Sequence, residues 1–224
     1  MSPTRRAMTG DGKLRKRDTI LRAAVEVIAE RGYFGARMAE VAERAQVADG
    51  TLYLYFKGKE DLLVSILEEY SQAFITRARR DIEGVEDPRE RLTRIVERHL
   101  SSLERDRSLA QVFQIELRHT RRFLRRVAKG QVSDYLGLLE GIIADGARQG
   151  VFRSDVPAEV AARAVFGGID ECVTAWVLSK RPGPLSSQAR PLLDILLQGL
   201  EPPVRIGEKG GTAAGRAPGD GRKR

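Results

Sequence analysis

Apolar side chains recur every three or four positions along most of the chain, which is the period of an α-helix with one buried face. The pattern is clear at Ile20, Ala24 and Ile28, and again at Leu92 and Ile95. No run of Val, Ile or Thr alternates with polar residues as a half-buried strand would. The sequence therefore predicts an all-α protein of about nine helices.

Helix start and stop signals divide this pattern into segments. Asp87, Pro88 and Glu90 combine an N-cap, a proline at the first helical position and an acid in the first turn. Gly32 and Gly150 follow the last periodic residues of two segments, a common place for glycine. The predicted helices cover about 18–31, 38–45, 49–55, 59–82, a segment from 88, 109–117, 121–148, 157–180, and a last segment from 186 or 187 to 200.

The charge of the chain is concentrated at its two ends. Its 224 residues carry 39 Lys and Arg against 31 Asp and Glu, a formal net charge of +8. Residues 1–17 have a net charge of +5 and residues 205–224 of +4, which leaves −1 for residues 18–204. We expect disorder in both tails. The basic N-terminal arm is expected to supply long-range attraction to a polyanion.

Cysteine and histidine content narrows the class of protein. Cys172 is the single cysteine, which excludes a disulfide within the chain and is typical of a reducing compartment. With His99 and His119 it makes no zinc-ligand set of the usual spacing. No apolar run approaches the roughly 20 residues of a membrane-spanning helix. We expect a cytoplasmic protein without metal, cofactor or membrane contact.

Two short predicted helices, joined by a three-residue turn and flanked by longer helices, have the arrangement of a helix-turn-helix. In the second of them Leu52 and Phe56 are expected to face the core. Thr51, Tyr53 and Tyr55 are then expected to face outward. Hydroxyl and aromatic groups on an exposed helix suit contacts with phosphates and base edges in a DNA major groove.

Two lysines follow this helix where a phosphate of bound DNA would lie. Lys57 lies in the connection, and Lys59 stands at the N-terminus of the next helix, itself a favourable place for an anion. The predicted DNA-binding residues are Arg37, Asp49, Gly50, Thr51, Tyr53, Tyr55, Lys57 and Lys59.

Three stretches of this region, 17–21, 32–34 and 47–63, resemble the DNA-binding domain of the TetR family. The resemblance implies a dimeric, all-helical repressor whose C-terminal helices bind a small effector. Family members often have Ser or Thr where Arg37 stands and Gly where Gln46 stands. The expected organisation is a disordered basic arm at 1–13, a DNA-binding domain at 14–74 with its motif at 37–56, an effector-binding and dimerisation domain at 75–201, and a disordered basic tail at 202–224.

The second half resembles one branch of that family, the acyl-CoA-responsive repressors of fatty-acid degradation. The stretches that carry this resemblance are Leu109-Ala110, Gln114 to Arg118, Phe166 to Glu171, Val173-Thr174 and Trp176-Val177. It implies a homodimer on double-stranded DNA that is released by long-chain acyl-CoA and that controls fatty-acid-degradation genes. The expected protein is thus a regulator and not an enzyme.

The residue types of this half fit such an effector. A run of arginines at 118–126 offers bidentate contacts for the phosphates of CoA, and apolar side chains offer a tunnel for the acyl chain. A solvated helix face and an ordinary core explain the same two features and stay open. The predicted effector-binding residues are Phe113, Arg118, Arg121, Arg122, Arg125, Arg126, Phe166, Ile169, Val173 and Trp176.

The last two predicted helices favour a dimer. Small residues at 164, 167 and 168 allow close helix approach, and five leucines between 192 and 200 exceed what a small domain needs to bury. A twofold axis through four such helices predicts a near-palindromic operator.

Three alternatives remain at this point. A repressor of an efflux or other operon responding to an uncharged drug-like ligand would share the same fold. A helical enzyme is disfavoured by the lack of a Ser-His-Asp or Cys-His set in the sequence. An architectural DNA binder would use only the basic tails.

Overall fold

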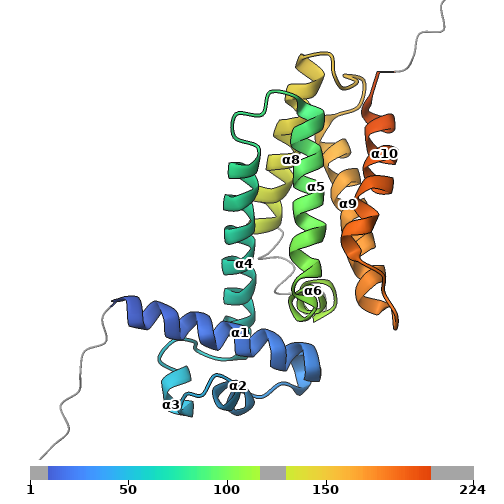
Figure 1. Cartoon of the computed structure of the whole chain (residues 1–224). Helices are drawn as coiled ribbons and strands as arrows, with labels where there is room; N and C mark the ends of the chain where they lie inside the picture. Colours follow the sequence, from blue (N-terminus) through green and yellow to red (C-terminus); the bar gives the residue numbers. More distant parts are fainter. Residues whose placement is uncertain (1–9, 117–129, 203–224) are drawn as a thin grey trace, which may run out of the picture.

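The computed structural model describes residues 10–116 and 130–202. Within these ranges the chain forms nine α-helices, one short 3-10 helix and no strand, so the prediction of an all-α protein is confirmed. Figure 1 shows a small group of helices, α1 to α3, at the foot of a taller bundle. The helices are α1 (Gly10–Gly35), α2 (Met38–Arg44), α3 (Asp49–Leu52), α4 (Lys59–Asp81), α5 (Pro88–Glu104), α6 (Arg107–Gln114), α8 (Gln131–Arg148), α9 (Ala158–Leu178), the 3-10 helix η2 (Leu185–Gln188) and α10 (Ala189–Leu200).

Helix α1 starts earlier than the predicted start at Asp18. Lys, Arg and Leu side chains ahead of that residue are good helix formers. Arg17 anchors the extension, because its guanidinium lies 5.3 Å from the centre of the Phe56 ring and forms an ion pair with Glu69 of α4. The end of the basic arm is therefore helical from Gly10, where disorder was expected.

A kink interrupts the last turns of α1. The sequence predicts that the first helix ends at Gly32, whereas the helix continues to Gly35 with Gly32 in a non-helical conformation, φ 71° and ψ 158°. This region of backbone space is accessible almost only to glycine. The kink separates the straight part of α1 from the residues that lead into α2.

Helices α2 and α3 form the predicted helix-turn-helix. Gln46 in the turn between them has a positive φ of 55°, a conformation that favours glycine. Val41 and Ala42 of α2 are buried, as are Leu52 and Phe56. The prediction that the last two residues face the core is confirmed.

Helix α3 is shorter than predicted and ends at Leu52 rather than Tyr55. The chain continues as a tighter turn, in which the N–H groups of Leu54 and Tyr55 donate to carbonyls three residues earlier, at 3.1 and 3.0 Å. Side chains beyond Leu52 therefore do not follow the 3.6-residue period of an α-helix.

Helix α4 belongs to both parts of the molecule. It packs against α1 at the foot and against α5 and α8 in the bundle. Helix α5 begins where the sequence predicts, because the Asp87 carboxylate accepts a hydrogen bond from the N–H of Arg89 at 2.9 Å. Helix α6 crosses the foot of the bundle, where it packs against α1 and α9. The bundle of α4 to α10, the effector half of the chain, thus contacts the helix-turn-helix part through α4 and α6.

The connection after α8 closes tightly on that helix. Phe152 is only 1% exposed, and its ring lies against Gly146. A Cβ atom built on Gly146 would lie 2.2 Å from a carbon of the Phe152 ring. The absence of a side chain at residue 146 therefore lets this connection cover the end of the core.

We expect Gly146→Ala to lower the free energy of unfolding by about 1–3 kcal/mol, because the buried ring has to shift and the core is overpacked. Gly141→Ala on the same helix is the control, since a Cβ there meets no atom within 4 Å. Alanine is the better helix former, so the control is expected to keep or gain stability. Urea denaturation followed by circular dichroism measures both, and equal unfolding free energies would contradict the expectation.

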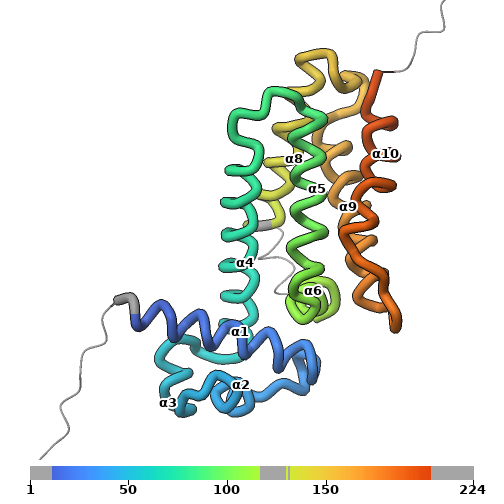
Figure 2. The backbone as a smooth tube through the Cα atoms, in the orientation of Figure 1, coloured from blue at the N-terminus to red at the C-terminus, as the bar shows by residue number. Residues whose placement is uncertain are grey.

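The described chain begins and ends at opposite ends of the molecule (Figure 2). Helix α1 starts beside the helix-turn-helix, whereas Pro202 follows α10 at the other end of the bundle. The helix predicted for 121–148 is described from Gln131 onward, as α8. Its earlier part lies outside the described residues, as do 1–9 and 203–224.

Candidate functional site

The tip of the helix-turn-helix presents large side chains to solvent. Tyr53 is 57% exposed and Leu54 is 73% exposed, while Asp49 and Gly50 are exposed in the first turn of α3. Thr51 is half-buried. Leu54 is absent from the predicted set, although residues three apart such as Thr51 and Leu54 lie on neighbouring sides of a helix. Its exposure at the end of α3 offers an apolar contact for a thymine methyl group.

Tyr55 does not face outward as expected. It is half-buried and packs against the core, with its ring centre 6.5 Å from that of Phe56. The tighter turn after Leu52 is the reason, because it rotates the following side chains away from the face that a continued helix would give them. Tyr53 therefore remains the exposed tyrosine of this segment.

The two predicted lysines differ in their surroundings. Lys57 is exposed, and its backbone N–H donates to Asp61 Oδ2 at 2.8 Å. The Lys59 ammonium donates to the carbonyls of Phe34 and Ala36 at 3.1 and 3.0 Å. Two of its three donors thus hold the connection between α1 and α2, and its contact with a DNA phosphate stays a prediction.

Lys59 also contacts an aromatic ring in the last turn of α1. Its Nζ atom lies 4.8 Å from the centre of the Tyr33 ring, a cation–π distance. Burial raises the pKa of the Tyr33 hydroxyl, and Glu60 adds to this shift. Lys59 therefore holds together the residues that lead from α1 into α2.

Basic groups on the helix-turn-helix are partly neutralised by acids of the same part of the chain. Arg44 of α2 makes two hydrogen bonds with Glu30, at 3.0 and 2.9 Å, and one with Glu26 at 3.1 Å. These bonds raise the pKa of Arg44 and lower that of Glu30. Arg37, at the N-cap of α2, is exposed. It thus fits a phosphate contact better than Arg44 does.

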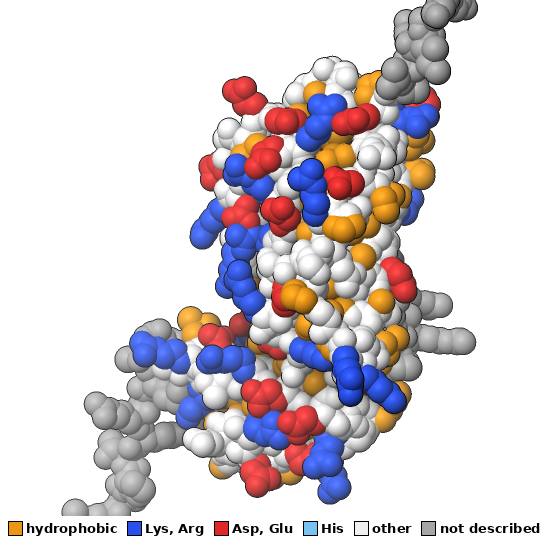
Figure 3. Space-filling view, turned by 45° about the vertical axis from the view of Figure 1, so that its right-hand side comes forward, with side chains coloured by type: hydrophobic (Ala, Val, Ile, Leu, Met, Phe, Trp, Pro, Cys, Tyr) orange, Lys and Arg blue, Asp and Glu red, His pale blue; other side chains and the backbone are white. Residues whose placement is uncertain are grey.

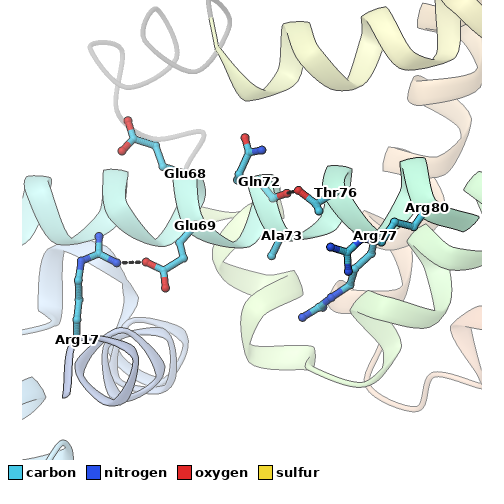
Figure 4. Close-up of a pocket in the computed structure, with 8 residues that line it drawn as sticks. All are labelled: Arg17, Glu68, Glu69, Gln72, Ala73, Thr76, Arg77 and Arg80. Atoms are coloured by element: carbon cyan, nitrogen blue, oxygen red, sulfur yellow. Dashed lines mark hydrogen bonds and ion pairs between the residues drawn. The ribbon is translucent and has the colours of Figure 1, made fainter. Parts of the chain in front are cut away.

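A groove of about 570 Å³ lies between α1 and the outer side of α4 (Figure 4). Arg17, Arg77 and Arg80 line it together with Glu68 and Glu69. Side chains of both signs share this open groove, so it offers neither a uniformly basic surface for phosphate nor an apolar interior for an acyl chain. The ion pair between Arg17 and Glu69 joins α1 to α4 within it.

The bundle contains an aromatic cluster to which four helices contribute. Phe74 of α4, His99 of α5, Tyr135 of α8 and Phe166 of α9 lie with ring centres 5.2–5.8 Å apart along the cluster. Of these four residues, the predicted effector-binding set contains only Phe166. Because α4 also contacts α1, this cluster connects the interior of the bundle with the foot of the molecule.

His99 is the member of the cluster whose protonation would bring a positive charge into this interior. Its Nδ1 lies 3.0 Å from the Tyr135 hydroxyl oxygen. Burial lowers the pKa of His99 to about 4, against a smaller opposing effect of Asp170, and burial also raises the pKa of Tyr135. The imidazole is therefore neutral at physiological pH and brings no charge into this interior.

The other apolar residues of the predicted effector set are spread along α6 and α9. Ile169 and Val173 are fully buried, and Phe113 is half-buried against the core. Trp176 donates its indole N–H to the Gly183 carbonyl at 2.9 Å. It therefore also ties the end of α9 to the connection that follows, and its contact with an effector stays a prediction.

The same helices also carry buried polar groups that are not among the predicted effector-binding residues. Gln114 of α6 is buried, and its side-chain oxygen lies 3.1 Å from the hydroxyl of Thr174 on α9. The Thr174 hydroxyl also lies 2.9 Å from the Asp170 carbonyl. The second of two glutamines in α6 is the only signal in the sequence, and it does not reveal the partner.

The cationic part of the predicted effector set cannot be placed on this framework. Arg118, Arg121, Arg122, Arg125 and Arg126 all lie in the range 117–129, outside the described residues. Their contact with an effector therefore stays a prediction from the sequence.

Helices α9 and α10 expose apolar side chains. Leu178 is 66% and Ile195 is 71% exposed, and Figure 3 shows apolar side chains among charged ones on the face that includes α10. Gly168 lies against Leu192 within the chain, since a Cβ there would come within 3.0 Å of it. Gly167 meets no atom within 4 Å, so of these two glycines it is the one left for a partner.

Two kinds of feature are absent from the part of the chain that the structure describes. No helix there is long and apolar enough to cross a membrane. No group of three or more His, Cys, Asp or Glu side chains in those ranges is arranged to hold a metal ion.

Comparison with known proteins covers both parts of the fold. Residues 20–66 match the family of bacterial regulatory proteins of the tetR type, and residues 67–199 match the C-terminal region of YsiA-like proteins. The fatty acid metabolism regulator protein of Bacillus subtilis is 39% identical over 181 residues, which are 81% of this chain and 93% of that protein.

Solved structures agree with this assignment. The transcriptional regulator FadR from Bacillus subtilis, crystallised in complex with stearoyl-CoA, is 38% identical, with a TM-score of 0.78 over 82% of this chain and 99% of that one. The fatty acid degradation regulator FadR from Bacillus halodurans is 36% identical, with the same TM-score and coverage. The structure contains the helix-turn-helix that this family uses to bind DNA. The chain therefore belongs to the tetR family of bacterial regulatory proteins and is a DNA-binding transcriptional regulator rather than an enzyme.

Proposed function

We propose that this chain is a homodimeric repressor of fatty-acid-degradation genes that long-chain acyl-CoA releases from a near-palindromic operator. The observation that carries the proposal is the likeness, through both halves of the chain, to a regulator crystallised with stearoyl-CoA. The chain works in the cytoplasm and needs no cofactor besides its effector. Regulators of the family are typically dimers, which supports the twofold assembly.

The described residues supply an apolar interior for the acyl chain. Ile169 and Val173 lie fully buried on α9, the helix that also supplies Phe166 to the aromatic cluster, in which the neutral His99 brings no charge. A long hydrocarbon is stabilised in such an interior by roughly 0.8 kcal/mol per buried methylene. The arginines at 118–126 would then hold the phosphates of CoA through bidentate hydrogen bonds.

DNA is read by the exposed tip of the helix-turn-helix. Tyr53 and Leu54 contact base edges or sugars, while Arg37 and Lys57 contact phosphates. The second subunit, joined through α9 and α10, presents the same tip to the other half of the operator. The effector weakens binding by favouring a state in which the two tips no longer fit the operator together.

A second candidate shares the DNA-binding part and differs in the ligand. The neutral, apolar interior of the described bundle also suits an uncharged drug-like compound, in which case the operator controls an efflux or other gene set. The arginines at 118–126 distinguish the two candidates, because an uncharged ligand has no phosphate for them to bind.

A mobility-shift titration on the promoter next to the chain's own gene tests the proposal. Acyl-CoA of graded chain length is expected to release the DNA, with long chains active at the lowest concentrations. Free CoA and the matching free fatty acids serve as controls and are expected to be weaker, because each lacks half of the contacts. Retention of the operator at all acyl-CoA concentrations, with release by an uncharged compound, would favour the second candidate.

A further inference from the structure

The kinked end of α1 is completed by one side chain from α6 and one from the residue that follows it closely, Glu116. In an uninterrupted helix the N–H of Tyr33 would donate to the carbonyl of Ala29, four residues earlier. At the kink the Tyr33 N–H donates instead to Glu116 Oε2, at 2.7 Å. The Ala29 carbonyl accepts from Gln111 Nε2, at 2.8 Å. Both groups of this helical rung are therefore bonded by residues of the effector half.

The Glu116 carboxylate is buried at this kink. The residue follows α6 and is only 8% exposed. A Cβ built on Gly32 would lie 3.7 Å from both carboxylate oxygens, so the glycine lets the carboxylate come close to the backbone. A hydrogen bond from a backbone amide to a buried carboxylate is charge-assisted and stronger than one between neutral groups.

The residues held in this way lead directly into the helix-turn-helix. Ala36 is buried after the kink, and Arg37 is the N-cap of α2. Lys59 binds the carbonyls of Phe34 and Ala36 from the side of α4. The connection between α1 and α2 is thus fixed from two sides, by Glu116 at its start and by Lys59 at its end.

We propose that Glu116 is a positioning residue for DNA reading: its bond to the Tyr33 amide sets the orientation of α2 and α3 relative to the effector half. A shift of α6 changes this bond first, because α6 packs directly on α1. A reading surface that is held in place before it meets DNA binds more tightly than one that must be ordered on binding. Loss of the bond therefore weakens operator binding.

The same bond accounts for part of the response to the effector, and this step rests on the proposed function. An effector acts only through contacts that differ between the two states of the protein. In sequence Glu116 stands two residues before Arg118, the first of the arginines assigned to the CoA phosphates. A movement of the chain at that arginine therefore reaches Glu116 through two residues, and the Tyr33 amide through the hydrogen bond that Glu116 accepts.

Glu116→Ala removes the acceptor, and Glu104→Ala is a matched control. The Glu104 carboxylate also accepts a backbone N–H from a distant residue, Ser186, at 3.0 Å, but within the effector half. We expect Glu116→Ala to weaken operator binding at least fivefold and to reduce, without abolishing, the factor by which acyl-CoA weakens it. Glu104→Ala is expected to keep the wild-type values of both quantities, measured by fluorescence anisotropy on the full chain.

Hydrogen exchange gives a readout that does not depend on the effector. Peptides covering residues 29–47 are expected to exchange faster in Glu116→Ala than in the wild type or in Glu104→Ala. If the wild-type protein is not released by acyl-CoA, the proposed function fails, and faster exchange with weaker operator binding still supports the positioning role. Unchanged exchange and unchanged operator affinity in Glu116→Ala would overturn it.

Glu116→Gln covers the case in which the alanine variant does not fold. The amide oxygen keeps an acceptor for the Tyr33 N–H without the charge, so the variant is expected to be intermediate in operator affinity and in exchange. Melting temperatures of the glutamine and Glu104→Ala variants are expected to agree closely. A Glu116→Gln protein with wild-type operator affinity and wild-type exchange would contradict the proposal.

Discussion

Tyr53→Ala is expected to weaken operator binding by at least about thirtyfold while the melting temperature stays unchanged. The side chain is 57% exposed at the end of α3, so its removal opens no cavity in the core. Loss of one specific contact with DNA costs about 1–3 kcal/mol. In a homodimer both subunits lose it, which gives about 2–6 kcal/mol, and 2 kcal/mol corresponds to roughly thirtyfold in the dissociation constant.

Two further variants make this result specific. Tyr53→Phe keeps the ring and is expected to retain most of the affinity if stacking or apolar contact dominates. Leu54→Ala, at the neighbouring exposed position, is expected to weaken binding less, because it removes a smaller surface. Footprinting on the operator checks the reading mode. An unchanged footprint with Tyr53→Ala would favour binding by the basic tails, which the variant leaves intact.

Replacing Arg121, Arg122, Arg125 and Arg126 by glutamine is expected to raise the acyl-CoA concentration for half-maximal release at least a hundredfold. A hydrogen bond to a charged group contributes about 1.5–3 kcal/mol, so the loss of even two such contacts amounts to about 3 kcal/mol or more. Operator affinity without effector is expected to stay close to wild type. Mobility shifts with and without stearoyl-CoA measure both quantities.

A control with the same change in net charge separates ligand contacts from general electrostatics. Arg77, Arg80, Arg163 and Arg190 are exposed arginines of the described effector half, and their replacement by glutamine is expected to leave release by acyl-CoA near wild type. Equal loss of release in the two quadruple variants would assign the effect to net charge. Unimpaired release in the first variant would place the CoA phosphates elsewhere.

Sequence pattern and local chemistry predicted much of the architecture. Helix α5 starts at Pro88 because Asp87 caps its first turn, an interaction between near neighbours that any reader of the sequence can identify. The helical period likewise placed Leu52 and Phe56 in the core. Such predictions succeed where the determining contacts lie within one or two turns of helix.

Features that depend on distant residues were not predictable in this way. The early start of α1 relies on Arg17 contacting Phe56 and Glu69, which come from other segments of the chain. The bond between Tyr33 and Glu116 joins residues 83 positions apart. A glycine ahead of Tyr33 and an acid just after an apolar helix were the available signals, and neither one indicates its partner.

The prediction that the Tyr55 side chain faces outward was wrong for a local reason. It assumed that α3 continues to that residue, whereas the turn tightens after Leu52. A short helix leaves few hydrogen bonds to enforce its period, so its last side chains follow the tertiary packing instead. Positions at the end of a four-residue helix are therefore the hardest to assign to a face.

The placement of the described ends has a practical consequence for live-cell measurement. Pro202 lies at the end of the bundle remote from α3, whereas Gly10 lies beside the reading helices. A fluorescent protein joined directly after Pro202 is therefore attached away from the operator, and one joined directly ahead of Gly10 is attached next to it. The C-terminal fusion is the design suited to following promoter occupancy in cells as fatty-acid supply changes.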